Sequence, residues 1–269
     1  MKTLCIFLCL LLGNKSVNET PPAGQSTKNI ISESVNCEGV YQGHLQGVCT
    51  NHKDAIYWSF TTSLVKSDLK GRVINKIPVD SHHGDLCFYN NKIYVAVNLG
   101  KFNQPPGQAD SWVYIYDAES LDELSKQKVP ELVHGAGGMA CDGKRFIIVG
   151  GLPEGYNENY LYEYGLDLKY KRRHEIPGYT LLGIQTAAFS DKHWWFGCYG
   201  SPQVTLKTNQ RFKLKGKWTF DSSLGIERLS GDKLLVGKGN CQKDVGCTGK
   251  VVIAEPDKTN GLRILNNQK

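Results

Sequence analysis

Seven polar side chains stand at or beside the start of five Gly-containing segments that recur along the chain. Each side chain precedes an apolar run, and the seven agree to within about one residue of register. They are His44, His82, His83, Asp85, His134, Gln185 and Glu227. Imidazole together with carboxylate is a combination that binds metals or transfers protons, so this set is the first candidate for chemistry.

Three interpretations of the set stay open. In the first, His44, His82 and His134 bind one divalent metal ion, for which zinc, manganese and iron are the suitable choices. In the second, no metal is needed, and acid and base chemistry is shared by three residues in a confined pocket, namely His83, Asp85 and Glu227. In the third, the side chains only satisfy one another around a water-filled channel.

Three loops supply a second group of candidates. They are residues 98–106, 150–154 and 197–202, which are rich in Gly and Pro and follow equivalent β-rich runs. Loops on a rigid scaffold commonly carry recognition, so we expect these to form the rim of a site. The predicted substrate-binding side chains are Asn98, Lys101, Asn103 and Tyr199, together with Gln185 from the first group.

The elements that position these residues repeat with a period of about 45 residues, which is typical of a propeller blade. A β-rich run follows each opening, at residues 56–59, 93–96, 146–149, 194–197 and 234–237. Further strands are expected at 111–117 and 129–133 in the second copy, and at 160–164 and 172–176 in the third. A short helical turn is expected at 120–126. The sequence predicts an all-β fold, a five-bladed β-propeller with about four antiparallel strands per blade.

The ends of the chain indicate export. Residues 1–15 have the pattern of a signal peptide, residues 16–36 read as a flexible leader, and residues 37–269 form a single propeller domain. We expect a secreted or periplasmic monomer with no membrane insertion after signal removal. Of the later cysteines, Cys241 and Cys247 are the best disulfide pair because they bracket a short loop.

Charge gives little indication of a polyanion partner. The net charge of +6 is spread over many single lysines. The dense basic run at 169–173 is read as a solvated turn, so nucleic acid is not an expected partner. The tryptophans Trp58, Trp194 and Trp195 are predicted to be core side chains of the sheets, not platforms for sugars.

Part of the chain resembles a known family. The order of residues 45–48, 84–86, 92–95 and 113–117 is similar to the opening blades of the five-bladed glutaminyl cyclotransferases. That resemblance implies cyclisation of N-terminal glutamine with a glutamate near the channel as the proton-transfer group, and the matching position here is Asp85. The whole chain looks more like uncharacterised secreted bacterial propellers, which supply a fold and no activity.

Three functions follow as hypotheses. The leading one is an enzyme, a hydrolase or lyase, that acts on a small polar molecule or saccharide in the central channel, with or without a metal. The second is a glutaminyl cyclotransferase-like enzyme. The third is a propeller that binds a ligand or partner without catalysis.

Overall fold

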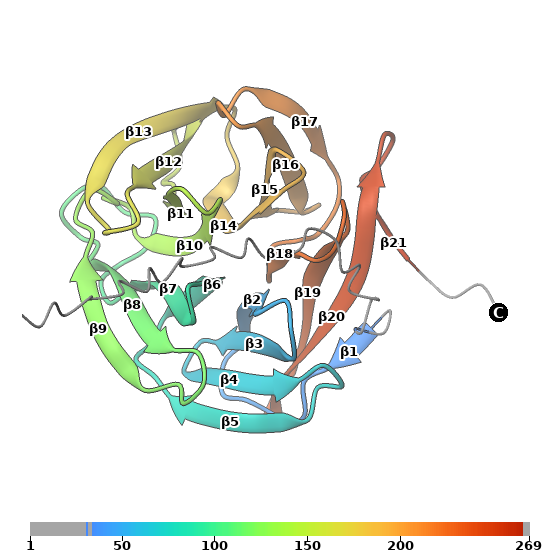
Figure 1. The fold of residues 1–269 in the computed structure, drawn as a ribbon. Coiled ribbons are helices and arrows are strands. Elements are labelled where there is room, and N and C mark those ends of the chain that lie inside the picture. The colour runs from blue at the N-terminus through green and yellow to red at the C-terminus, as the bar shows by residue number, and fades with distance from the viewer. Residues whose placement is uncertain (1–30, 32–33, 266–269) are drawn as a thin grey trace, which may run out of the picture.

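The computed structural model describes residues 31 and 34–265. Five antiparallel sheets stand in a ring around a common axis, and Figure 1 views this ring end-on. No helix occurs among the described residues, so none there is long and apolar enough to cross a membrane. The chain is therefore a five-bladed β-propeller, as predicted. The predicted signal peptide and most of the predicted leader lie outside the described residues.

The strands of the first four blades follow one another outward from the ring axis. Blade 1 contains β2 (Leu45–Thr50), β3 (Ala55–Phe60), β4 (Ser63–Asp68) and β5 (Val73–Pro78). Blade 2 contains β6 (His83–Tyr89), β7 (Lys92–Asn98), β8 (Ser111–Asp117) and β9 (Glu123–Lys128). Blade 3 contains β10 (Ala136–Cys141), β11 (Phe146–Gly150), β12 (Glu158–Tyr164) and β13 (Tyr170–Pro177). Blade 4 contains β14 (Leu181–Ser190), β15 (His193–Tyr199), β16 (Val204–Asn209) and β17 (Leu214–Trp218).

Blade 5 closes the ring with segments from both ends of the described chain. Its inner strands are β18 (Ile226–Arg228), β19 (Leu234–Gln242) and β20 (Gly246–Asp257). The outer edge of β20 pairs with β1 (Ser34–Asn36) and, further along, with β21 (Gly261–Ile264). Backbone hydrogen bonds between distant segments therefore hold the first blade to the last.

The outer strand of blade 2 corrects two expectations. The region 120–126 is not a helical turn, and residues 129–133 are not the fourth strand, because β9 begins at Glu123. Asp117 Oδ1 accepts the backbone N–H groups of Glu119 and Ser120, both at 2.8 Å, and this tight turn returns the chain to the sheet early. Every residue of β9 is exposed, so no apolar alternation marks the strand in the sequence.

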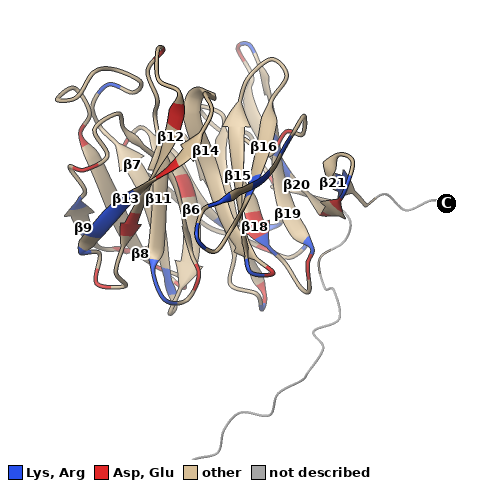
Figure 2. Cartoon of the chain, turned by 90° about the horizontal axis from the view of Figure 1, so that it is seen from above, with Lys and Arg blue, Asp and Glu red and all other residues tan. Residues whose placement is uncertain are grey.

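Apolar side chains fill the spaces between neighbouring blades in five clusters. Trp58 lies between blades 5 and 1, Trp194 between blades 3 and 4, and Trp195 between blades 4 and 5. All three are at most 2% exposed, which confirms that they are core side chains. Full burial of a large apolar side chain stabilises the fold by about 2–3 kcal/mol. Figure 2 shows charged residues mainly in the loops and on outer strands such as β13.

Cys241 and Cys247 form the predicted disulfide between β19 and β20. The described cysteines that remain free are Cys37, Cys49, Cys87, Cys141 and Cys198. Disulfides persist in oxidising compartments, so this bridge fits an extracellular or periplasmic protein.

The centre of the ring is filled by Asp85 of β6, which is fully buried. Its Oδ2 accepts the backbone N–H of Ala187 in β14 at 3.0 Å, across the axis. Gly47 of β2 and Gly138 of β10 flank it, and a Cβ on Gly47 would lie 2.4 Å from both Asp85 Cα and Oδ1. Real Cβ atoms do not approach backbone so closely, so the aspartate fits only because its neighbours are glycines.

We predict that Gly47→Ala destabilises the protein by about 3 kcal/mol, because the inner strands must move apart to admit the methyl group. Gly239→Ala is the matched control, since a Cβ there would meet the Leu224 side chain at 3.2 Å and no backbone closer than 3.4 Å. Urea denaturation of both variants measures the difference. Equal stability of the two would contradict the packing described for Asp85.

Candidate functional site

The axis of the propeller has two open ends. The upper face is the side on which the inner strands β2, β6, β10 and β14 begin, and the lower face is the side on which they end in tight turns. Asp85 lies between the two. Each face carries a pocket; five of the predicted site residues line the upper pocket, Glu227 lines the lower one, and the others line neither.

The upper pocket has a volume of about 160 Å³. Its wall brings together residues from four of the five blades, with side chains from blades 1, 2 and 4 and glycines at two positions. The lining residues are His44, Gln46, His82, Gly84, Phe102, Asn103, Gly137, Leu182, Gln185 and Tyr199. Five of the predicted residues therefore meet here, namely His44, His82, Gln185, Asn103 and Tyr199.

His44 is the best-defined polar group of the upper pocket. Its Nε2 lies 3.3 Å from the Tyr199 hydroxyl, which comes from the end of β15. Burial, together with the neighbouring imidazole of His82, lowers the pKa of His44 below its usual value near 6.5. Burial also raises the pKa of Tyr199. At neutral pH the pair therefore consists of a neutral imidazole and a protonated phenol.

The loop after β7 supplies one wall of the pocket. The Phe102 ring meets the His82 ring edge-on, with centroids 5.7 Å apart. This approach needs Gly135, whose φ is +104° and where a Cβ would lie 2.5 Å from Phe102 Cδ1. Asn103 Oδ1 accepts the backbone N–H of Leu152 at 3.0 Å, which ties the loop to blade 3.

Two predicted residues shape this loop without lining the pocket. Asn98 is buried, and its side chain binds the backbone of Gly100 and Asp110 at 3.1 and 2.8 Å. Lys101 is exposed on the loop, away from the pocket lining. Asn98 thus supports the rim, and Gln185 donates one amide hydrogen to the Leu182 carbonyl at 2.7 Å within it.

His83 points away from both pockets and is fully buried. Its Nδ1–H donates to the Asp80 carbonyl at 2.6 Å, and the Tyr116 hydroxyl lies 2.7 Å from Nε2. Burial lowers the pKa of His83 to about 4, so Nε2 is unprotonated and accepts from Tyr116. Both ring nitrogens are used within the fold, and His83 is therefore placed as a structural residue.

His134 is likewise held inside the protein. Its Nδ1–H donates to the Gln104 carbonyl at 2.8 Å, and its ring packs edge-on against Tyr156 with centroids 5.0 Å apart. The three predicted metal ligands are therefore not brought together. Within residues 34–265 no group of three or more His, Cys, Asp or Glu side chains is arranged to hold a metal ion.

The two predicted carboxylates lie below the upper pocket. Asp85 is sealed in the centre, where burial raises its pKa well above the usual range, and among the described residues its Oδ1 has no hydrogen-bond partner. Glu227 lies in the lower pocket, on the opposite face. Its side chain is 15% exposed, and burial raises its pKa to about 8.

Sequence reasoning did not select Gln46, Phe102 or His52. Gln46 sits two residues after His44, where only the register of the strand decides whether it faces the axis. Phe102 lies in the loop 98–106, where the polar side chains of Asn98, Lys101 and Asn103 are the predicted candidates. His52 lies in a hairpin turn far from the aligned openings, and nothing in its sequence neighbourhood marks it.

Comparison with known proteins identifies the fold. No family model and no curated protein matches the chain. A glutaminyl cyclase of Myxococcus xanthus is similar in structure, with a TM-score of 0.58, 10% identity, and coverage of 88% of this chain and 97% of that one. Such low identity shows a shared fold alone.

Two further solved structures are less similar, with TM-scores below 0.5. Kuenenia stuttgartiensis hydrazine synthase gives 0.47 at 13% identity, covering 92% of this chain and 70% of that one. The computationally designed Ika4 protein gives 0.41 at 12% identity, covering 65% and 96%.

We predict that Glu227→Gln changes how stability depends on pH. A carboxyl whose pKa is raised by folding binds its proton more tightly in the folded state, so the wild type loses stability as pH rises between about 4.5 and 8. Relative to the variant, the loss is at most about 1.4 kcal/mol per pH unit. Urea denaturation at several pH values measures it, and parallel curves for the two proteins would refute the assignment.

Proposed function

We propose that the protein binds a small polar molecule in the upper pocket and that His44 acts on this molecule as a general base. The observation that carries the proposal is the contact between a neutral His44 imidazole and the Tyr199 hydroxyl inside a cavity. A neutral imidazole accepts a proton, and a protonated phenol donates a hydrogen bond to a substrate oxygen. Proton transfer of this kind serves a hydrolase or a lyase.

The size and lining of the pocket limit the ligand. A cavity of about 150 Å³ in another protein holds benzene, so about 160 Å³ encloses a molecule, or one end of a molecule, of comparable size. The lining contains no Asp, Glu, Lys or Arg. Recognition therefore rests on hydrogen bonds from amides, imidazoles and a hydroxyl, which suits an uncharged polar group such as an amide or the terminal unit of a saccharide.

Cyclisation of N-terminal glutamine is a narrower candidate. The fold is shared with a glutaminyl cyclase, and the amides of Gln46, Gln185 and Asn103 line a pocket that suits a glutamine side chain. In that reaction the α-amine attacks the side-chain carbonyl, a base takes one amine proton and delivers it to the amide nitrogen, and the C–N bond of the side-chain amide breaks to release ammonia. Because Asp85 is sealed below the pocket, His44 would be the base.

The metal-assisted reaction has no geometric support in the upper pocket, since His134 is held elsewhere. We therefore propose chemistry by the side chains alone. A secreted or periplasmic location and a monomeric state stay predictions from the sequence.

The test is an NMR screen of monosaccharides, primary amides and glutaminyl dipeptides, followed by assays of each binder for hydrolysis, elimination or ammonia release. We expect His44→Gln to lower turnover by about 100-fold or more, and Tyr199→Phe to weaken binding by about tenfold. Activity should fall as pH drops through the lowered pKa of His44, because the base is then protonated.

His193→Gln is the matched control, since this histidine lies in the β14–β15 hairpin on the lower face and its Nδ1 bonds the Asp191 carbonyl. If a ligand binds to the wild type and not to Tyr199→Phe, but is never turned over, the protein is a ligand-binding propeller without catalytic activity. If no ligand gives NMR signals that differ between the wild type and His44→Gln, the proposal is overturned.

A further inference from the structure

The lower pocket is a second cavity, on the opposite end of the axis from the upper one. Its volume is about 240 Å³, and it is formed where the inner strands end. Asp85 lies between the two pockets, so a ligand in one does not reach the other. The polar side chains of this pocket that are considered for ligand binding are those of Glu227, Arg228 and His52.

Glu227 presents its carboxyl in the wall of this pocket. Within residues 34–265, no side chain donates a hydrogen bond to it, and the nearest titratable partner is His52, whose Nε2 lies 4.0 Å from Glu227 Oε1. That distance is longer than a hydrogen bond. The carboxyl therefore has hydrogen-bonding capacity left over for a ligand.

Arg228 is the last residue of β18 and is exposed at the rim of the pocket. Its guanidinium forms no ion pair with any carboxylate of residues 34–265. Its charge adds to the effect of burial in lowering the pKa of His52, and it offsets part of the rise that burial causes in the pKa of Glu227. An unpaired guanidinium is a ready partner for a carboxylate, which it binds through two parallel hydrogen bonds.

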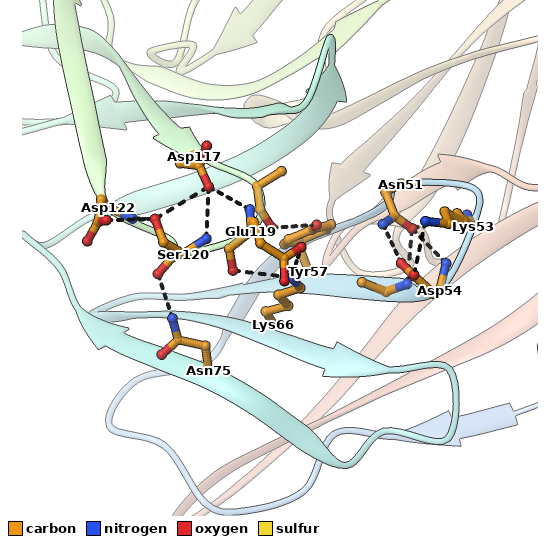
Figure 3. A network of polar contacts seen from close by, with 12 residues as sticks. Asn51, Lys53, Asp54, Tyr57, Lys66, Asn75, Asp117, Glu119, Ser120 and Asp122 are labelled. Carbon is orange, nitrogen blue, oxygen red and sulfur yellow. Dashed lines mark hydrogen bonds and ion pairs between the residues drawn. The ribbon is translucent and has the colours of Figure 1, made fainter.

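His52 is held in place by a rigid hairpin turn. Asn51 Oδ1 accepts the backbone N–H groups of Lys53, Asp54 and Ala55, each at 3.0 Å, and its amide donates to Asp54 Oδ1 at 2.8 Å. Figure 3 shows these contacts within blade 1. The backbone N–H of His52 also donates to Thr50 Oγ1 at 3.1 Å. These contacts order the backbone of the turn that carries the imidazole.

Two aromatic rings and two thiols complete the wall beside the polar groups. They belong to Phe88, Phe189, Cys87 and Cys141. The remaining carboxylate, Asp142, is occupied, because its Oδ2 binds Arg145 Nε at 3.2 Å and its Oδ1 accepts two backbone N–H groups. The site therefore combines one unpaired guanidinium and one carboxyl with two aromatic rings in a mainly polar lining.

We propose that the lower pocket binds a small organic carboxylate, whose anionic group pairs with Arg228 and accepts a hydrogen bond from the Glu227 carboxyl. The rings of Phe88 and Phe189 contact the body of the ligand. By proportion with the benzene-sized cavity of about 150 Å³, the pocket encloses a ligand of roughly ten heavy atoms. Glu227 supports such binding at neutral pH because its pKa of about 8 keeps the donating proton in place.

The pKa values of the other groups around Glu227 allow the effect of Glu227 ionisation on ligand binding to be isolated. Burial holds the pKa of His52 at about 4 and raises the pKa of Cys141 to about 11. Burial also raises the pKa values of Cys49 and Cys87 well above their usual range. Burial also raises the pKa of Asp85, which lies between the two pockets, so an Asp85→Asn variant is needed as a control.

The test is calorimetric titration of the full chain with benzoate, with benzyl alcohol as the uncharged comparison. At pH 6.5 we expect benzoate to bind and benzyl alcohol to bind more weakly. Arg228→Gln should weaken benzoate binding by about tenfold or more. Arg72→Gln, which removes a guanidinium paired with Asp68 in blade 1, should leave it unchanged, as should His44→Gln in the upper pocket.

Between pH 6.5 and 9 the affinity of the wild type should fall, because the ionised Glu227 repels the ligand. Glu227→Gln keeps a hydrogen-bond donor and should bind benzoate with nearly constant affinity over the same range. The Asp85→Asn variant should show the same loss of benzoate affinity with rising pH as the wild type. No benzoate binding, binding unaffected by Arg228→Gln, or a fall that persists in Glu227→Gln would each overturn the proposal.

Discussion

The narrowness of a five-bladed ring is the constraint on which the rest of this structure depends. Five inner strands meet so closely that one aspartate fills the centre, and it fits because two of its neighbours, Gly47 and Gly138, have no side chain. The hydrogen bond from Ala187 to Asp85 joins opposite sides of the ring. A wider ring would leave an open channel, whereas this one has a closed axis and a separate pocket at each end.

Burial of carboxyl groups near the axis costs folding free energy, and apolar packing between the blades offsets that cost. Burial keeps the pKa values of Asp85 and Glu227 raised, so each carboxyl opposes folding once it ionises. Five apolar clusters between the blades, with tryptophans among their largest members, supply the opposing stabilisation. Pairing of β1 and β21 with β20 then ties the ends of the ring together without a covalent bond.

The same backbone module produces two pockets of different chemistry. On the upper face the openings of the blades and the loop after β7 gather uncharged donors and acceptors, including His44 and Tyr199. On the lower face strand β18 supplies an unpaired guanidinium and a partly exposed carboxyl, Arg228 and Glu227. Strand geometry is repeated in every blade, so the differences arise from the side chains at the two ends of the inner strands and from the loops beside them.

The repeat period and the β-rich runs were enough to predict the fold, because they depend on local alternation and on spacing along the chain. The disulfide between Cys241 and Cys247 followed from a short loop for the same reason. Which polar residues share a pocket was decided by tertiary structure. β-Bulges in the inner strands, between Leu45 and Gly47 and between His83 and Leu86, shift the register by one residue. A shift of one residue turns a side chain to the other face, so His83 became a structural residue while its neighbour His82 entered the pocket.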